Sequence, residues 1–259
     1  MGKTLLAVLR RIAAPPDRPL IQWQNFLLAE RNPALPMFQN APSNQLQRIV
    51  IFDFDGVLTD TMPEMLRFSD QVCAELGYPR RTTAADIRRL PRMGFDYLAR
   101  QLGIPEELVP QYVHRILECF DEQSITYSLF EGMREVILDL ATDSVLAIVS
   151  GNRQRVIRRF LEKYQIAHCF WHIAGIDQPG NKREKILAIR QAVSLSLPTV
   201  MIGDAVSDIQ AAREAGAISI AVSWGHQERE RLLEAQPDAI ADHPQDILIV
   251  IRTNLTLRS

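Results

Sequence analysis

The chain has 259 residues, 47% of them hydrophobic and 23% charged, and its formal net charge is −2. This is the composition of an ordinary globular protein, and so small a net charge gives no electrostatic case for a nucleic-acid partner or an anionic membrane. No apolar run reaches the length of a transmembrane span, and three widely spaced cysteines predict no disulfide framework. We therefore expect a cytoplasmic protein with no membrane span.

Residues 1–47 form an N-terminal extension that is rich in proline, holding six of the fifteen prolines of the chain. Short helices are predicted at residues 3–13 and 21–30, with proline-rich turns between them. We expect this extension to pack along the core. Docking to a partner or to a membrane surface through residues 1–47 is the alternative.

From residue 48 onward, short apolar runs alternate with amphipathic stretches. Strands are predicted at Ile49–Phe52, Val145–Val149, Thr199–Ile202, Ile218–Val222 and Ala239–Ala241. Helices are predicted at Met133–Ala141, Arg153–Tyr164, Lys182–Ala192, Asp208–Ala215 and Glu228–Ala235. Such alternation predicts an α/β fold in which residues 48–61 and 129–259 form a Rossmann-like, doubly wound parallel sheet.

Residues 62–128 interrupt this alternation, because they contain no convincing strand. Amphipathic helices are predicted there at Pro63–Leu76, Thr83–Leu90, Phe95–Leu102 and Glu106–Phe120, with glycines and prolines as breaks. The segment therefore predicts a helical subdomain inserted into the α/β core.

The most informative motif follows the first predicted strand, where Asp53 and Asp55 lie two residues apart. Alternation at an extended strand end points both carboxylates the same way. Two like charges so close are costly unless a cation or a proton lies between them. A nucleophile and an acid/base that share one site explain the pair, whereas capping of nearby backbone N–H groups is the structural alternative. Gly56 allows the backbone to turn sharply beside a bound group.

Polar residues also end two later strands. Ser150 follows the second predicted strand, and Gly203-Asp204 followed by Asp208 ends the third, with Lys182 between them in sequence. In an open α/β sheet, ligands bind at the carboxyl ends of strands. Trp224-Gly225-His226 follows a further strand, but no motif gives it a role.

In this order, the aspartate pair, hydroxyl, lysine and GDxxxD resemble the four motifs of the haloacid dehalogenase superfamily, over about residues 48–245. The helical insertion between the first two motifs resembles a C1-type cap, as in phosphoglycolate-phosphatase-like and β-phosphoglucomutase-like members. The resemblance implies Mg²⁺-dependent hydrolysis of a small phosphorylated metabolite, with the cap excluding water.

The resemblance also implies roles for the four aspartates. Asp53 would be the nucleophile that forms an aspartyl-phosphate, and Asp55 the acid/base. The presence of Asp55 disfavours a dehalogenase. Asp53, the backbone carbonyl of Asp55, Asp204 and Asp208 would hold Mg²⁺, which prefers oxygen ligands. Asp208 could instead, or in addition, be a helix N-cap.

Two further motif positions depart from the family pattern. Ser150 would bind a phosphate oxygen, and Asn152, displaced by the intervening Gly151, is a weaker candidate for substrate binding. Ser150 could otherwise cap the helix that begins near residue 153. Lys182 would neutralise the phosphate, with Lys185 as a competitor because the usual KPxP is absent.

Arg92, in the predicted cap, is a candidate for a second anionic group of the substrate, with a solvated arginine as the alternative. His168, Cys169 and His172 have a spacing that zinc sites can use, but we expect a structural role. The activities that compete with a phosphatase are a β-phosphoglucomutase-type phosphomutase and a catalytically inactive binding protein of the same fold.

Overall fold

The computed structural model describes residues 46–90, 93–123 and 127–254. The helices predicted at residues 3–13 and 21–30 lie outside these described residues, and so does Arg92. Within it, none of the helices combines the length and the apolar character that crossing a bilayer requires.

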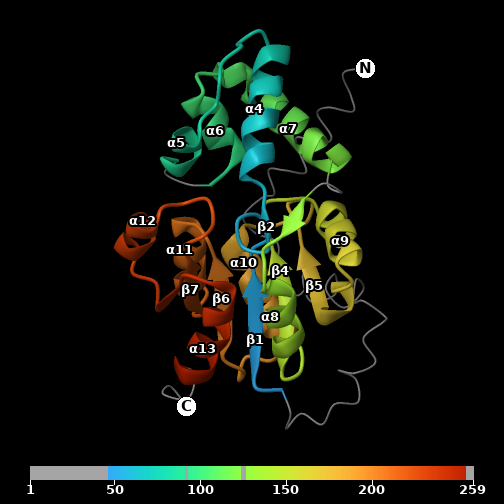
Figure 1. The fold of residues 1–259 in the computed structure, drawn as a ribbon, viewed down its shortest axis with the longest axis vertical. Helices are drawn as coiled ribbons and strands as arrows, with labels where there is room; N and C mark the ends of the chain where they lie inside the picture. The colour runs from blue at the N-terminus through green and yellow to red at the C-terminus, as the bar shows by residue number, and fades with distance from the viewer. Residues whose placement is uncertain (1–45, 91–92, 124–126, 255–259) are drawn as a thin grey trace.

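A six-stranded parallel sheet forms the centre of the molecule, in the order β5-β4-β1-β6-β7-β8 (Figure 1). The strands are β1 (Arg48–Phe52), β4 (Ser144–Val149), β5 (Phe170–Ala174), β6 (Thr199–Gly203), β7 (Ile218–Val222) and β8 (Ala239–Ala241). The α/β class with a doubly wound parallel sheet is thus confirmed. The edge strand β5 was not predicted, because the polar residue His172 interrupts its short apolar run.

Helices cover both faces of the sheet, which explains why its central strands are apolar on both sides. Ile49 and Ile51 share an apolar cluster with residues of α10 (Lys182–Val193) and α11 (Val206–Glu214). Val50 and Phe52 belong to the cluster on the opposite face. That face is covered by α8 (Met133–Leu140), α9 (Gln154–Lys163) and α13 (Pro244–Asn254), while α12 (Arg229–Glu234) packs beside α11.

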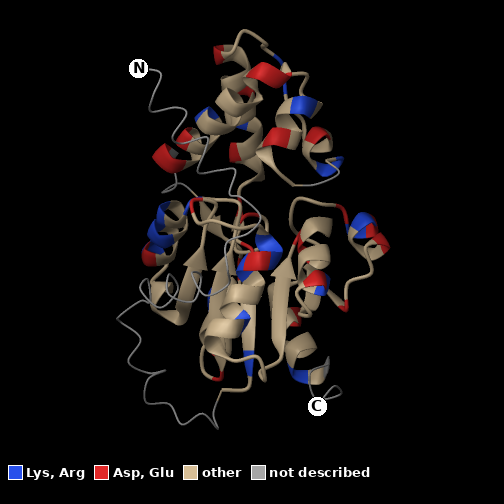
Figure 2. Cartoon of the chain, turned by 180° about the vertical axis from the view of Figure 1, so that it is seen from behind, with Lys and Arg blue, Asp and Glu red and all other residues tan. Residues whose placement is uncertain are grey.

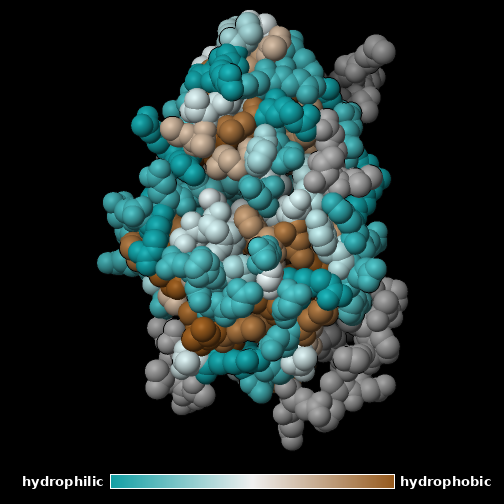
Figure 3. Space-filling view, in the orientation of Figure 1, coloured by the Kyte–Doolittle hydropathy of each residue, from teal (hydrophilic) through white to brown (hydrophobic). Residues whose placement is uncertain are grey.

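Helix α13 was not predicted from the sequence. In the space-filling view, hydrophobic residues reach the surface over the lower half of the molecule, in the region of α8 and α13 (Figure 3). Ile249 on α13 is 60% exposed.

Between β1 and β4 the chain leaves the sheet and forms a group of helices beyond its carboxyl edge (Figure 1). We call residues 62–123 the helical insertion. It comprises α4 (Met62–Glu75), α5 (Ala84–Arg88), α6 (Phe95–Gln101), a 3₁₀ turn (Glu106–Leu108) and α7 (Val109–Gln123). At its base, β2 (Thr59–Asp60) pairs with β3 (Ser128–Leu129) in an antiparallel ribbon that was not predicted, because its strands have two residues each.

Apolar packing and a group of charges around Asp121 fasten the helical insertion to the core. Buried residues of the insertion and of the sheet belong to a single hydrophobic cluster. Asp121 on α7 is buried and accepts a 2.8 Å hydrogen bond from Arg153, which precedes α9, and it also pairs with Arg155. Figure 2 shows acidic residues at the lower end of the insertion above a basic cluster on the core.

Asp121→Asn should lower the free energy of unfolding by about 1–2 kcal/mol, because it removes a buried charged acceptor from two arginines that can partly turn to solvent. Urea denaturation monitored by circular dichroism measures the change. Asp96→Asn is the matched control. It breaks a pair whose side chains are both 45% exposed, and it should cost no more than about 0.5 kcal/mol. Equal effects of the two substitutions would contradict a fastening role for Asp121.

Two histidines lie in β5 or just before it, His172 and His168. Among the residues that the structure describes, His168, Cys169 and His172 belong to no group of potential metal ligands. His172 is buried within the sheet, and burial lowers the pKa of its imidazole to about 4. The folded protein therefore keeps this ring neutral at pH values where an unfolded chain would protonate it.

A buried neutral histidine makes stability depend on pH. Stability should fall as the pH drops below about 6.5, where the unfolded chain gains a proton that the folded chain does not bind until about pH 4. Between pH 7 and pH 5, wild type should lose about 2 kcal/mol more than His172→Gln in denaturant unfolding. His168→Gln, at an exposed position, should follow wild type. If the free energy of unfolding fell equally with pH in wild type and in His172→Gln, this account would be refuted.

Candidate active site

Three carboxylates converge at the carboxyl edge of the sheet. Asp53 follows β1, Asp204 follows β6, and Asp208 lies in the first turn of α11. Each offers one oxygen, and these oxygens all lie within 4.8 Å of one another. Because β1 and β6 are hydrogen-bonded neighbours, residues 151 positions apart in sequence meet at one place.

Local backbone structure holds these carboxylates in place. The backbone N–H of Asp53 donates to Ile202 O at 2.8 Å, and its Oδ1 accepts from the N–H of Phe54 at 2.7 Å. Asp208 is the third residue of α11 rather than its N-cap, and its Oδ2 accepts from the N–H of Ala205, the N-cap, at 3.1 Å. Asp208 thus supports the helix start while it faces the cluster.

Lys182 supplies a positive charge to this cluster. It is the first residue of α10, whose start is fixed by a capping box between Asn181 and Glu184. The Lys182 ammonium lies 2.7 Å from Asp53 Oδ2 and also contacts Asp208 Oδ1. Burial opposes its charge, but the carboxylates of Asp208 and Asp53 outweigh that effect and raise the pKa of Lys182.

Lys185, the competing lysine, points elsewhere. Its buried ammonium donates to Gly175 O at 2.7 Å. Burial and the charge of Lys182 lower the pKa of Lys185 to about 8. The geometry therefore places Lys182, and not Lys185, beside Asp53.

Asp55, Ser150 and Asn152 form the other side of the site. The Asn152 amide lies 3.3 Å from both carboxylate oxygens of Asp55, so the intervening Gly151 does not keep it away from the site. Ser150 is buried, and its Oγ accepts from the N–H of Asn152 at 3.0 Å. The N-cap of α9 is Arg153, so Ser150 does not cap that helix.

Asp55 is held in a setting that favours its protonated form. Burial, followed by the charge of Asp53, raises the pKa of Asp55 to about 6. A nearby histidine, His226, and hydrogen bonds from Thr61 and Asn152 work in the opposite direction. The two aspartates of the first motif thus differ: Asp53 is paired with an ammonium, and Asp55 is hydrogen-bonded to neutral groups.

The donor set fits a small, hard dication. Asp53, Asp204 and Asp208 offer only oxygen atoms, at mutual distances that one ion can bridge, and such ligands suit Mg²⁺. Burial raises the pKa of Asp208 to about 7 even against the pull of Lys182. A bound dication would relieve this repulsion among the carboxylates.

His226 belongs to the same site, although no sequence motif assigned a role to its segment. It is buried, with its Nδ1 2.9 Å from Asp204 Oδ2. Burial opposes protonation, but the Asp204 carboxylate outweighs it and raises the pKa of His226 to about 8. No motif spacing would have found this residue, because the contact depends on how the loop after β7 folds back.

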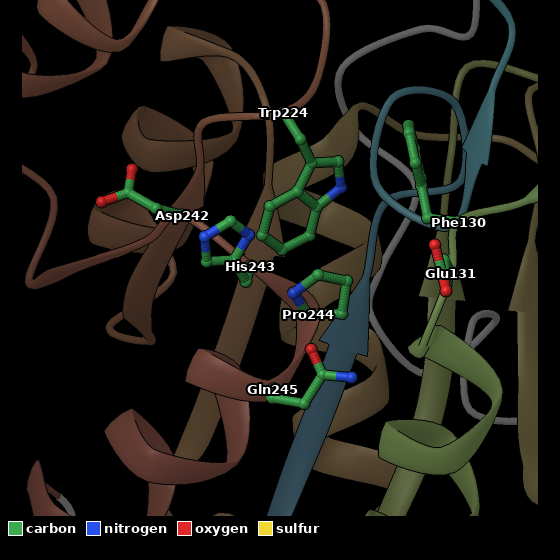
Figure 4. Close-up of a pocket in the computed structure, with 7 residues that line it drawn as sticks. All are labelled: Phe130, Glu131, Trp224, Asp242, His243, Pro244 and Gln245. Atoms are coloured by element: carbon green, nitrogen blue, oxygen red, sulfur yellow. The ribbon is translucent and has the colours of Figure 1, made fainter.

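A surface cavity of about 410 Å³ lies apart from the carboxylate cluster (Figure 4). It is lined by Phe130, Glu131, Trp224, Asp242, His243, Pro244 and Gln245, none of which belongs to the cluster. Trp224 links this cavity to the loop after Asp55, because its Nε1 donates to Val57 O at 3.3 Å.

A parallel α/β sheet that gathers carboxylates and an ammonium at its carboxyl edge has the arrangement of an α/β enzyme, in which ligands bind at that edge. The sequence profile described as haloacid dehalogenase-like hydrolase matches residues 50–222, more than half of the chain. The chain belongs to this family of hydrolases.

Two phosphoglycolate phosphatases are similar to this chain at moderate sequence identity. The phosphoglycolate phosphatase of Vibrio cholerae is 28% identical over 220 residues, which covers 79% of this chain and 96% of the relative. That of Aliivibrio fischeri is 26% identical over 219 residues, with the same two coverages of 79% and 96%. These matches reach almost the full length of both relatives.

Solved structures share the fold. A haloacid dehalogenase-like hydrolase from Streptococcus pneumoniae superimposes with a TM-score of 0.68 at 22% identity, covering 80% of this chain and 99% of that one. A hydrolase from Pseudomonas syringae gives a TM-score of 0.65 at 19% identity, covering 80% and 98%. The architecture is therefore common to sequences that differ at most positions.

Gly225 should be intolerant of any side chain. A Cβ there would overlap the side chain of Asp204 and lie 2.6 Å from the backbone oxygen of Gly56. Gly225→Ala should lower the free energy of unfolding by about 1–3 kcal/mol, because backbone must move to relieve the overlap. Chemical denaturation measures this loss. Gly151→Ala, where a Cβ has nothing within 4 Å, should be close to neutral, and equal losses would disprove the close approach.

Proposed function

We propose that this enzyme is a Mg²⁺-dependent phosphatase that hydrolyses a small phosphomonoester through an aspartyl-phosphate on Asp53. The observation that carries the proposal is the position of the Lys182 ammonium, 2.7 Å from Asp53 and in contact with Asp208. A nucleophilic carboxylate needs such a partner, because an anionic phosphate would otherwise repel it. The names of the relatives from Vibrio cholerae and Aliivibrio fischeri support the same class of reaction.

In the first step, an Asp53 carboxylate oxygen attacks phosphorus, and the bond from phosphorus to the leaving oxygen breaks. Asp55 donates its proton to that oxygen, so an alcohol leaves. The amide of Asn152, 3.3 Å from both Asp55 oxygens, keeps the acid oriented for the transfer. Lys182 and Ser150 would hold the phosphoryl oxygens.

In the second step, Asp55 accepts a proton from water, whose oxygen attacks phosphorus. The bond between phosphorus and Asp53 breaks, which returns the carboxylate and releases inorganic phosphate. Asp53, Asp204, Asp208 and the backbone carbonyl of Asp55 would hold Mg²⁺. When bound, this ion supplies charge neutralisation for the phosphate and for the carboxylates around it.

The helical insertion would act as the cap that excludes water and selects the leaving group. Its position beyond the carboxyl edge of the sheet supports this role. Arg92, which lies outside the described residues, remains the candidate for binding a second anionic group of the substrate, such as a carboxylate or a second phosphate. The substrate class is a small phosphorylated metabolite in the cytoplasm, and phosphoglycolate is the first compound to test.

Asp53→Asn should reduce phosphate release at least about a thousandfold, because an amide cannot serve as the nucleophile. The measurement is release of inorganic phosphate from an aryl phosphate, with Mg²⁺ and with a chelator, followed by phosphoglycolate. Chelation should abolish turnover of wild type. Asp96→Asn, an exposed carboxylate on the insertion, is the matched control and should turn over normally.

If correctly folded wild type released no phosphate from either compound, the proposed phosphatase activity would be contradicted. Transfer of the phosphoryl group to a sugar phosphate would then identify a mutase, which uses the same aspartates.

A further inference from the structure

His226 makes two hydrogen bonds to the same atom of a proposed metal ligand. Its backbone N–H lies 2.7 Å from Asp204 Oδ2, and its Nδ1 lies 2.9 Å from that oxygen. A carboxylate only accepts, so Nδ1 carries the proton. Two donors on one oxygen fix the rotation of the carboxylate, and the second oxygen of Asp204 therefore keeps a single position.

The other nitrogen of His226 faces the start of the helical insertion. Nε2 lies 3.4 Å from Oγ1 of Thr61, which is fully buried and precedes α4. Although Thr61 is the N-cap residue of α4, its side chain makes no capping hydrogen bond. Its hydroxyl also acts on the nearby carboxyl of Asp55, whose pKa it lowers. Side-chain contacts thus join Asp204 through His226 to Thr61, which lies beside Asp55.

The backbone around this series is packed closely enough to require glycine. Gly56 has a φ of +76°, and a Cβ there would lie 2.7 Å from the Nδ1 atom of His226. A Cβ on Gly225, the residue before His226, would overlap Asp204. The loops after β1 and β7 therefore press the imidazole against Asp204, which gives it little freedom to adopt another rotamer.

We propose that His226 is a positioning residue that orients Asp204 for a divalent cation and joins this ligand, through Thr61, to the acid/base Asp55. The proposal rests on the proposed function, because it assigns Asp204 to the metal. Metal ligands are commonly oriented by a hydrogen bond from a neighbouring group, and loss of such a partner weakens metal binding 10–100-fold. A buried histidine with only a packing role would leave metal affinity unchanged.

The test compares two substitutions in the full-length enzyme. His226→Leu removes the side-chain donor, whereas His226→Asn keeps an N–H close to the place of Nδ1. Mg²⁺ affinity is measured by titration calorimetry on metal-free protein, after circular dichroism has shown that each variant is folded. We expect affinity to fall at least about tenfold in His226→Leu and to stay within about threefold of wild type in His226→Asn. His243→Leu, at an exposed position outside the site, is the control and should bind as wild type.

A second variant tests the link to Asp55. Thr61→Val keeps the volume and removes the hydroxyl, so kcat for aryl phosphate should fall about tenfold while Mg²⁺ affinity stays unchanged. Folded His226→Leu with wild-type Mg²⁺ affinity overturns the positioning role, even where wild type is an active phosphatase. If His226→Leu does not fold, a tenfold loss in folded His226→Asn overturns it as well. Wild type without Mg²⁺ binding and without turnover refutes the proposed function itself.

Discussion

Repulsion among three buried carboxylates is the constraint on which the rest of the structure depends. Asp53, Asp204 and Asp208 lie close enough to share one ion, in a place where water has little access to screen them. The fold answers this repulsion with two cationic side chains. α10 begins where it brings the ammonium of Lys182 against two of the acids, and the loop after β7 brings the imidazole of His226 against the third. The order of the strands follows from the same need, since β1 and β6 must be neighbours for the acids to meet.

The same constraint explains why some positions near the cluster have no side chain. The acids can approach one another only if the loops that carry them are close, and a Cβ on Gly203 would overlap the side chain of Asp208. Gly56 adds a positive φ of 76°, a conformation that other residues rarely adopt. These glycines allow the carboxylates to approach one another, because a Cβ at either position would overlap an acid of the cluster.

Local signals in the sequence predicted the parts of the site that lie at strand ends. An apolar run followed by carboxylates, as at Asp53, predicts both the strand and the place where its polar side chains gather. The strand β5 was missed because His172 places a polar residue inside a run of only five residues, and tertiary burial decides its conformation. The choice between Lys182 and Lys185 depended on the direction in which each side chain leaves α10. Only the three-dimensional structure fixes that direction. His226 was out of reach for a similar reason, since it contacts residues 22 and 165 positions away in sequence.

The helical insertion is tied to the acid Asp55 from two directions, and this arrangement links its position to the state of the site. On one side, Thr61 is the N-cap residue of the first helix of the insertion, and its hydroxyl lowers the pKa of the nearby Asp55 carboxyl. On the other side, Asp121 near the end of the last helix pairs with Arg153, whose chain neighbour Asn152 holds both oxygens of Asp55. A rigid-body movement of the insertion would pull on both connections. A displacement of the insertion would therefore change the surroundings of Asp55, and under the proposed function it would act on the proton donor and on the exclusion of water together.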